Sequence, residues 1–397
     1  MSTSTSTFIA TPTTSRSRST TAHDVCQSLS QRPAMSLSPL PVTTLSTTSW
    51  RKVYPRVGQF AMTEEEKVVA AGPQGLFYFK RVRDHASRPW SEARPLPNTP
   101  AVLNSSSVSG LAINLRESRL DVYCVSNGVM HNFYRSEKDG PSFMMNPHPP
   151  LSTFLVSGTP AITLVKDEIN HPKGWSLVVP CQSGGLLHTS TTGPSEHPRY
   201  GLEPEKWEPV AYVAKNLGVI SAVSIATTHT KKRNEKGTDI VAVCIASARL
   251  YTIEGRFERE SSYGSSLKWK AQAPTRICHP GEVTGNPVLV EQTKTSYTKE
   301  NQLDLFVPSA EGGIFHFVRT TSTPDEWHMI ARFAFPEGLP TVSCLAFHGR
   351  DDWQQSRQFW ALVQNGGRLY HISTYEGAKP WSGSYLRPVV TPGPFSD

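Results

Sequence analysis

The sequence is short of the features that mark several large classes of protein. Only 18% of its 397 residues are charged, and no stretch of about 18 apolar residues is present that would cross a membrane. The six cysteines show no CxxC or other metal-ligand spacing, and Cys124, Cys181 and Cys244 lie within or beside apolar runs. These three residues are therefore expected to be small buried thiols, and no membrane span is predicted.

Motifs of familiar catalysis are also missing. The chain has no GxSxG, HExxH, Walker or helix-opening GxGxxG motif. His148, His229, His279 and His348 stand in stretches expected to be loops, where a lone histidine is usually solvated. No catalytic residue, metal ligand or cofactor is therefore predicted. The net charge of +7 comes from scattered Lys and Arg that do not alternate with aromatic residues, so nucleic acid is not an expected partner.

Residues 1–48 differ from the rest because Ser, Thr and Pro dominate them and Asp24 is their only acidic residue. Such a composition cannot bury a core, so the segment is predicted to be a disordered tail ahead of a folded domain over residues 49–397. It lacks the apolar core of a secretory signal, which favours a cytoplasmic protein. Its Ser-rich, Arg-bearing, acid-poor character leaves a mitochondrial transit peptide as the alternative.

The rest of the chain contains a repeat. Residues 312–319 read GGIFHFVR and residues 366–373 read GGRLYHIS, and four related segments precede them. Alignment of the six copies, which are 53 to 65 residues apart, places a polar-tipped ring at one position: Tyr78, His131, His188, Tyr251, His316 and Tyr370. We interpret this His/Tyr column as a packing element whose tips bond neighbouring loops, rather than as six ligands.

Each copy follows an apolar run that ends in Gly, Asn or Ser, which is typical of two strands joined by a tight turn. A further apolar run stands upstream, and an aromatic residue opens a fourth run downstream: Trp90, Phe143, Trp207, Trp269, Trp327 and Trp381. Helical periodicity is almost absent. The sequence therefore predicts an all-β protein, a six-bladed β-propeller of four-stranded blades over residues 49–397.

The sequence leaves open how the ring closes. Trp50 resembles the outer-strand tryptophans, which favours an N-terminal segment that completes the last blade. Alternatively, residues 50–61 form the inner strand of the first blade. Both alternatives bring the two ends of the folded domain together, because a closed ring has no gap between its first and last blades.

Propellers commonly bind ligands in the central channel or on the face where the inner strands begin. The expected inner-strand starts supply hydroxyls and one amide beside Leu111, Ile220 and Val342. The candidate substrate-binding residues are Ser109, Thr159, Ser221, Asn286, Thr341 and Ser343. This lining predicts a mostly apolar funnel that suits a lipophilic small molecule held by a few hydrogen bonds.

The segments GTPAITLV, RLDVYCVSNGVMHNFYR and QLDLFVPSAEGGIFHFVR carry a resemblance that extends over residues 50–390. They resemble the repeats of propeller lectins that bind fucose and related sugars. The resemblance implies sugar binding between blades. The blades of this chain differ in length and share no repeated Trp/Arg/Glu set, so a series of equivalent sugar sites is not expected.

The overall pattern also resembles the fungal hetero-Diels–Alderases of tropolone-sesquiterpene (xenovulene-type) biosynthesis. This resemblance implies a pericyclase of secondary metabolism. A hydroxymethyl tropolone would lose water to give an o-quinone methide, which would add across a humulene-type alkene to close a dihydropyran ring. The reaction needs no cofactor, only two lipophilic reactants held in one near-attack arrangement.

Three functions are therefore open, with the hetero-Diels–Alderase as the leading prediction. It requires one deep apolar pocket. A fucose-binding lectin requires shallow polar sites between blades, and a protein-interaction propeller without catalysis requires a broad ring surface. The sequence predicts no oligomeric state.

Overall fold

The computed structural model describes most of the region from residue 57 to residue 389. The described ranges are 57–63, 65–82, 90–96, 99–100, 102–116, 119–136, 142–166, 172–191, 207–229, 238–259, 265–270, 273–292, 302–320, 322–333, 341–351, 357–365, 367–375 and 385–389. The proposed tail, together with Trp50 and Trp381, lies outside these ranges.

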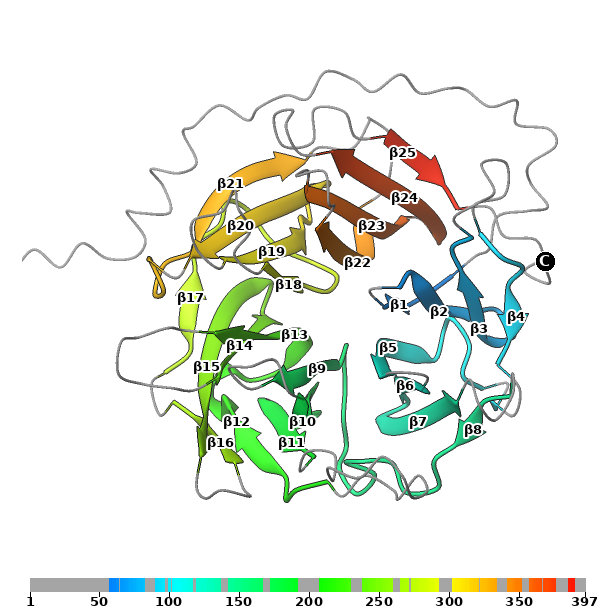
Figure 1. Cartoon of the computed structure of the whole chain (residues 1–397), viewed down its shortest axis with the longest axis horizontal. Coiled ribbons are helices and arrows are strands. Elements are labelled where there is room, and N and C mark those ends of the chain that lie inside the picture. The colour runs from blue at the N-terminus through cyan, green and yellow to red at the C-terminus, as the bar shows by residue number, and fades with distance from the viewer. Residues whose placement is uncertain are drawn as a thin grey trace, which may run out of the picture.

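Six antiparallel sheets form a ring around a central axis, and each sheet is one blade (Figure 1). Blade 1 contains β1 (Phe60–Met62), β2 (Lys67–Gly72), β3 (Gly75–Lys80) and β4 (Arg94–Pro95). Blade 2 contains β5 (Val108–Arg116), β6 (Arg119–Ser126), β7 (Val129–Ser136) and β8 (Met144–Met145). Blade 3 contains β9 (Ala161–Lys166), β10 (Pro172–Pro180), β11 (Leu186–Ser190) and β12 (Ala211–Val213).

The second half of the ring continues the pattern. Blade 4 contains β13 (Ile220–His229), β14 (Thr238–Ala246), β15 (Arg249–Arg259) and β16 (Ser265–Trp269), with β17 (Thr275–Ile277) also paired to β15. Blade 5 contains β18 (Val288–Gln292), β19 (Gln302–Pro308), β20 (Ile314–Thr320) and β21 (His328–Phe333). Blade 6 contains β22 (Val342–Asp351), β23 (Arg357–Asn365), β24 (Arg368–Tyr375) and β25 (Tyr385–Pro388). One 3-10 turn, η1 (Lys215–Leu217), links blades 3 and 4. The six-bladed, all-β prediction is confirmed.

The hydrophobic core is divided among the interfaces between blades. β14 shows why, because successive side chains of a strand point to opposite faces. Ile240, Ala242 and Cys244 pack toward blade 3, whereas Val241 and Val243 pack toward blade 5. A strand buried on both faces reads as a continuous apolar run, which is the pattern that the repeats show.

Among the described residues, the ring closes between blade 6 and blade 1. β1 is the inner strand of blade 1, and β25 completes blade 6. Val57 N donates a hydrogen bond to Gly367 O over 2.9 Å, and Gln364 Nε2 donates one to Val57 O over 3.0 Å. The second alternative, an inner strand of the first blade within residues 50–61, is therefore confirmed at Phe60 and Ala61, and the role expected of Trp50 lies outside the described residues.

The outer aromatic residues act as wedges between blades. The Trp269 ring of blade 4 lies 5.3 Å from the His188 ring of blade 3, and Phe143 of blade 2 lies 6.0 Å from Tyr78 of blade 1. Trp327 packs into the core between blades 4 and 5. One detail of the prediction is wrong, because Trp269 ends β16 rather than opening it.

Three further expectations meet the structure here. Cys124, Cys181 and Cys244 are buried and free, as predicted, and burial raises the pKa of Cys124 and Cys244 to about 12. His229 and His348 were expected in loops but lie in β13 and β22. Among the described residues, no helix has the length and apolar character needed to span a membrane.

Candidate functional site

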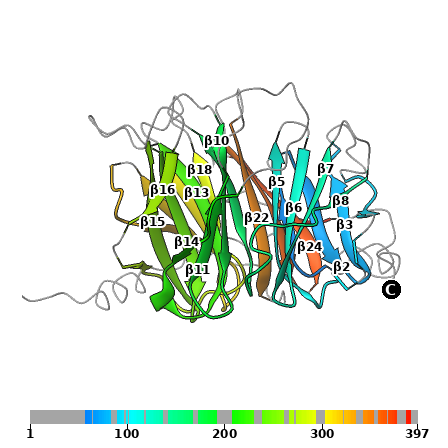
Figure 2. The same cartoon turned by 90° about the horizontal axis from the view of Figure 1, so that it is seen from below.

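The strands stand roughly upright, so the blades present two faces (Figure 2). We call the face that carries the turns between the second and third strands the turn face, and the opposite one the loop face. Each inner strand begins at the turn face, since Ile220 at the start of β13 pairs with Ala246 at the end of β14. The six predicted substrate-binding residues therefore lie at the turn face around the axis.

Three of these residues occupy one repeated position. Ser109, Ser221 and Ser343 each sit at an irregularity in the pairing of an inner strand, in blades 2, 4 and 6. All three are exposed, as is Thr341. Ser109 Oγ donates a hydrogen bond to Val125 O over 3.3 Å, and Ser221 Oγ donates one to Ile245 O over 3.4 Å. These hydroxyls are accessible to a ligand.

The other two residues join neighbouring blades. Thr159 N donates a hydrogen bond to Ser221 O over 3.1 Å, and Thr159 O accepts one from Val223 N. Asn286 Nδ2 donates to Leu345 O, and Asn286 Oδ1 accepts from Leu345 N, both over 2.8 Å. Both side chains are buried, so these two positions serve the closure of the ring.

The expected apolar lining of the funnel is wrong at the positions on which it was based. Leu111, Ile220 and Val342 are 3%, 0% and 0% exposed and pack into the cores between blades. Ile220 and Val342 directly precede the exposed Ser221 and Ser343, so the alternation of side chains along a strand turns them to the other side. Leu111 follows Ser109 by two residues and is turned inward because the pairing of β5 is irregular between Val108 and Gly110. At the first residues of these inner strands, the exposed groups are therefore serine hydroxyls and not the aliphatic side chains of Leu111, Ile220 and Val342.

The His/Tyr column is structural where its contacts are resolved. His188 Nε2 lies 2.9 Å from Ser176 Oγ, and His316 Nε2 lies 2.7 Å from Asp304 Oδ1. All four residues are buried, and burial lowers the pKa of His188 to about 4. The rings thus bond the adjacent strand of their own blade rather than a neighbouring loop.

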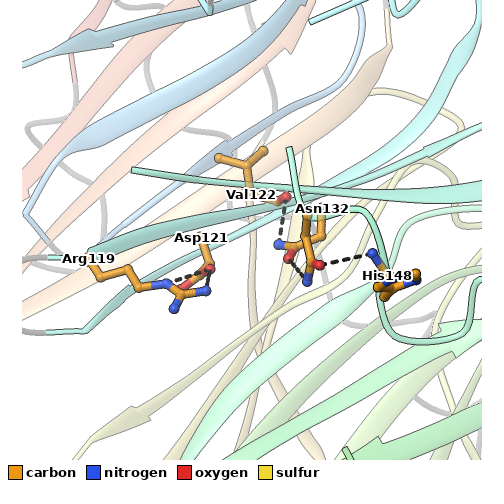
Figure 3. Close-up of polar contacts among 6 residues, drawn as sticks. Arg119, Asp121, Val122, Asn132 and His148 are labelled. Atoms are coloured by element: carbon orange, nitrogen blue, oxygen red, sulfur yellow. Dashed lines mark hydrogen bonds and ion pairs between the residues drawn. The ribbon is translucent and has the colours of Figure 1, made fainter. Parts of the chain in front are cut away.

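A second polar group, in blade 2, is also structural (Figure 3). Asn132 is buried, donates to Val122 O and accepts a hydrogen bond from Asn146 Nδ2 over 3.1 Å. The main-chain N of His148 in turn donates to Asn146 Oδ1 over 3.0 Å, while the residue itself is exposed. This set of bonds fixes the segment after β8 and leaves His148 as the solvated loop residue that was expected.

A recess opens on the loop face between blades 4 and 5. Blade 4 and the residue after it contribute Thr228, Asp239, Ile240, Val241, Glu254 and Lys270, and blade 5 contributes Glu291, Gln302, Leu303, Arg319, Thr320, Pro324 and Asp325. The recess is open to solvent and its cavity volume is about 80 Å³, well below the roughly 300–1,000 Å³ of pockets that engulf a whole ligand. The recess therefore has room for one edge of a polar molecule.

An ion-paired carboxylate lies at the centre of the recess. Arg319 Nη2 of blade 5 donates to Glu254 Oε1 of blade 4 over 2.5 Å, and Lys270 Nζ bonds Glu254 Oε2. Burial by itself raises the pKa of Glu254, but the hydrogen bonds and charges of Lys270 and Arg319 outweigh it and lower the pKa. Glu254 is therefore ionised near neutral pH, and its two hydrogen-bond partners hold the carboxylate in place.

Aromatic surface and unmatched polar groups lie on the same interface. The Arg319 guanidinium carbon is 5.9 Å from the centroid of the Trp327 ring. Thr252 lies on the same face of β15 as Glu254, because the two residues are two positions apart in the strand, where they pair with Val243 and Val241 of β14. The hydroxyl of Thr252 and the indole N–H of Trp327 are buried and have no hydrogen-bond partner among the described residues. Unmatched buried donors of this kind require an explanation such as a water or a ligand.

The recess was missed by the sequence interpretation, although the repeat contains a signal for it. Glu254 and Arg319 each stand three residues after a member of the His/Tyr column. The same position in the six blades reads Arg81, Tyr134, Thr191, Glu254, Arg319 and Ser373. Glu254 is the single acidic residue in this series, and an arginine occupies the position in the next blade. The pair becomes visible only when equivalent positions of adjacent blades are compared.

The recess combines charged hydrogen-bonding groups in a shallow depression, and the Trp327 ring lies behind Arg319 in the core between the two blades. Carboxylate, guanidinium and ammonium groups can together accept and donate hydrogen bonds. Within the described residues, no group of three His, Cys, Asp or Glu side chains is placed to hold a metal ion. The recess is therefore lined mostly by polar and charged side chains.

The sequence matches no protein-family model and no curated protein sequence. Its fold resembles that of solved fungal proteins. An asparagine-to-glutamine mutant of Aleuria aurantia lectin, solved in complex with Fucα1-6GlcNAc, aligns with a TM-score of 0.51 and 12% identity over 86% of this chain and 99% of the lectin. AofleA from Arthrobotrys oligospora aligns with a TM-score of 0.53 and 9% identity over 87% of this chain and 89% of that one. At such identity the likeness shows the fold, a six-bladed propeller.

Proposed function

We propose that this protein is a carbohydrate-binding propeller that holds a glycan at the recess between blades 4 and 5. The observation that carries the proposal is the Glu254–Arg319 pair beside Trp327, with unmatched donors on the same interface. A shallow polar site between blades is what distinguishes sugar binding from the other two candidate functions. The fold shared with a lectin solved with a fucosylated disaccharide supports the choice of ligand class.

The site acts through positioning of hydroxyl groups. The Glu254 carboxylate accepts hydrogen bonds from sugar hydroxyls, and Lys270 and Arg319 donate to their oxygens. Hydrogen bonds to charged groups are each worth about 1.5–3 kcal/mol net. The side chains are already held in place by one another, so little conformational entropy is lost when a ligand binds.

The experiment is a glycan array with the full chain, followed by calorimetry on the best ligand, fucosylated glycans included. Arg319→Gln and Glu254→Gln are expected to weaken binding about 10- to 100-fold, because each removes a charged hydrogen-bonding group. Arg332→Gln is the matched control. It breaks a similar ion pair of blade 5, Arg332 Nη2 to Glu311 Oε2 at 3.1 Å, outside the recess. An array with no bound glycan, or equal loss in all three variants, would contradict the proposal.

The hetero-Diels–Alderase activity is a second proposal, supported by a different surface. Leu155 and Val219 are 64% and 67% exposed on the turn face, and Val219 lies two residues before the exposed Ser221. The Phe154 and Tyr212 rings meet at 6.2 Å nearby, since Phe154 adjoins Leu155. An apolar surface beside an accessible hydroxyl suits lipophilic reactants.

This second proposal is tested by incubating the full chain with a hydroxymethyl tropolone and humulene. Faster formation of one cycloadduct stereoisomer than in a protein-free control is the expected result, and Ser221→Ala is expected to slow it. A product mixture and rate equal to those of the control would exclude the activity for this pair of reactants. A purely protein-binding propeller would show neither this activity nor glycan binding.

A further inference from the structure

The interface between blades 1 and 2 is built like the interface between blades 4 and 5. Strand pairing, rather than a count along the sequence, identifies the equivalent positions. In β7 of blade 2, Arg135 pairs with Leu120, and in β20 of blade 5, Arg319 pairs with Leu303. Both leucines are buried in the core shared with the preceding blade. Because paired residues lie on one face of a sheet, the two arginines face the preceding blade from the same position of the repeat.

The residue that the preceding blade places opposite this arginine has the opposite charge in the two interfaces. In blade 4, Glu254 lies two residues beyond Thr252, on the face toward blade 5. In blade 1, Lys80 lies two residues beyond Tyr78, on the face toward blade 2. Thr252 and Tyr78 each pair with a valine that is buried in the corresponding core. Lys80 therefore occupies the position of Glu254, and two cations, which cannot form an ion pair, replace the Glu254–Arg319 pair.

The Arg135 side chain is half-buried beside two aromatic rings. Its guanidinium carbon lies 5.4 Å from the centroid of the Tyr78 ring of blade 1 and 6.0 Å from that of the Phe143 ring of blade 2. Its Nε is buried and has no hydrogen-bond partner among the described residues. Cation–π contacts hold a guanidinium in place without engaging its N–H donors, so Arg135 keeps donors for a ligand.

The described carboxylates nearby belong to other cations. In blade 1, Glu65, Glu66 and Glu92 pair with Lys67, Arg81 and Arg94 over 3.0, 2.7 and 3.8 Å. In blade 2, Asp121 pairs with Arg119 over 2.8 Å (Figure 3). Neither the exposed Lys80 nor Arg135 forms an ion pair with a described residue. The interface thus holds two cations that lack a counter-ion within the described part of the chain.

We infer that blades 1 and 2 hold a second binding site, which takes the carboxylate or sulfate group of an acidic sugar between Lys80 and Arg135. A guanidinium presents a planar fork of N–H donors that matches an oxyanion, and the Lys80 ammonium adds a second positive charge. The choice of a sugar rests on the proposed carbohydrate binding of the propeller. The preference for an anion rests on the residues of this interface alone.

The test is calorimetric titration of the full chain with a galacturonate oligomer, a sulfated galactose oligomer, an uncharged galactose oligomer of the same length, and sodium sulfate. At low salt, at least one of the two acidic oligomers is expected to bind about tenfold more tightly than the uncharged one. About 1 M NaCl shortens the Debye length to about 3 Å and is expected to remove most of this preference. Sodium sulfate alone is expected to bind much more weakly than the acidic oligomers.

Three variants locate the site. Arg135→Gln is expected to remove most of the tenfold preference. Lys80→Glu recreates the Glu–Arg pair of the other interface and is expected to abolish the preference, and it leaves the packed core untouched because Lys80 is exposed. Arg119→Gln is the matched control, since Arg119 lies 4.5 Å over the Tyr134 ring of the same blade but is neutralised by Asp121. It is expected to leave the preference unchanged.

The outcomes separate this inference from the proposed recess between blades 4 and 5. Acidic oligomers that bind no more tightly than the uncharged one, or a preference that Lys80→Glu and Arg135→Gln leave intact, would overturn the second site. Sodium sulfate that binds as tightly as the oligomers would overturn the choice of a sugar. A preference that depends on Arg135 and survives Arg319→Gln would support the second site, even if neutral glycans do not bind and the recess proposal fails.

Discussion

The two faces of blade 5 meet their neighbours in different ways. Toward blade 6, Phe306 stacks on Phe347 with ring centroids 3.8 Å apart, and Asn286 satisfies both main-chain groups of Leu345. Toward blade 4, the interface is apolar at Phe315 and then opens at Arg319 into the charged recess. The same strand alternation supplies both faces, so one repeat provides a sealed joint on one side and a candidate site on the other.

An interface between two blades is therefore sealed or open according to the polar side chains at its end on the loop face. The interface with blade 4 is also built from aromatic and aliphatic side chains. Its charged side chains lie at the end near the loop face, far from the turn face. Asp304 and His316 show the contrast, because on the blade 6 face these polar side chains are buried and bonded to each other at 2.7 Å. Polar groups that satisfy each other fix the fold, whereas groups that open to solvent are accessible to a ligand.

The largest effect is expected from removal of an aromatic ring at the sealed joint. Phe306→Ala should lower the free energy of unfolding by about 3–5 kcal/mol, because it leaves a cavity beneath Phe347. Denaturant unfolding of the full chain measures this loss. Ile330→Ala is the control, since Ile330 is 48% exposed on β21 and should change stability by less than about 0.5 kcal/mol. Equal losses would show that the joint is not a tightly packed interface.

A smaller loss is expected from the amide that bridges blades 5 and 6. Asn286→Ala should cost about 2–4 kcal/mol, because the buried N–H and C=O of Leu345 both lose their partner. Thermal and denaturant unfolding report it. Ser343→Ala, at an exposed hydroxyl on the neighbouring blade, should stay within about 0.5 kcal/mol. A tolerated Asn286→Ala would mean that water replaces the amide.

The blade 4 side carries a pH dependence. Burial, assisted by the charges of Arg249 and Arg276, lowers the pKa of His279 from 6.5 to about 4. The unfolded chain therefore binds the proton more readily, and stability present above pH 6.5 is lost as the pH falls toward about 4, by roughly 1–3 kcal/mol.

Unfolding curves from pH 8 to pH 4 test this dependence. His279→Gln cannot titrate and should flatten the curve, although burial likewise lowers the pKa of His188 to about 4 and contributes a similar slope. An unchanged slope in the variant would show that His279 does not contribute.

The smallest effect on stability is expected at the recess itself. Arg319→Gln should cost only about 1 kcal/mol, because Lys270 still compensates Glu254 and Gln keeps a hydrogen-bond donor at the buried position. The same variant should lose most glycan binding. Arg319→Gln is therefore expected to affect binding far more than stability, whereas Phe306→Ala is expected to affect stability first. A loss of several kcal/mol would instead make Arg319 part of the sealed structure.

The sequence predicted the fold because each repeat specifies its own local structure. Hairpin turns, continuous apolar strands and wedge aromatics recur in every unit, and six units of this kind close into a ring. The prediction was less successful around the axis. Whether Leu111 lines the channel or enters a core depends on which side of β5 faces the neighbouring blade, and that register is set by an irregularity at Ser109.

By itself the sequence determined the number of blades, their four strands and the burial of the strand cysteines, because these features depend on local periodicity and on repetition. The tertiary structure decided which residues meet across blades. Glu254 and Arg319 are 65 residues apart in the chain and form an ion pair only because the ring places blade 4 against blade 5. The candidate site belongs to two repeats at once, so neither repeat read alone contains it.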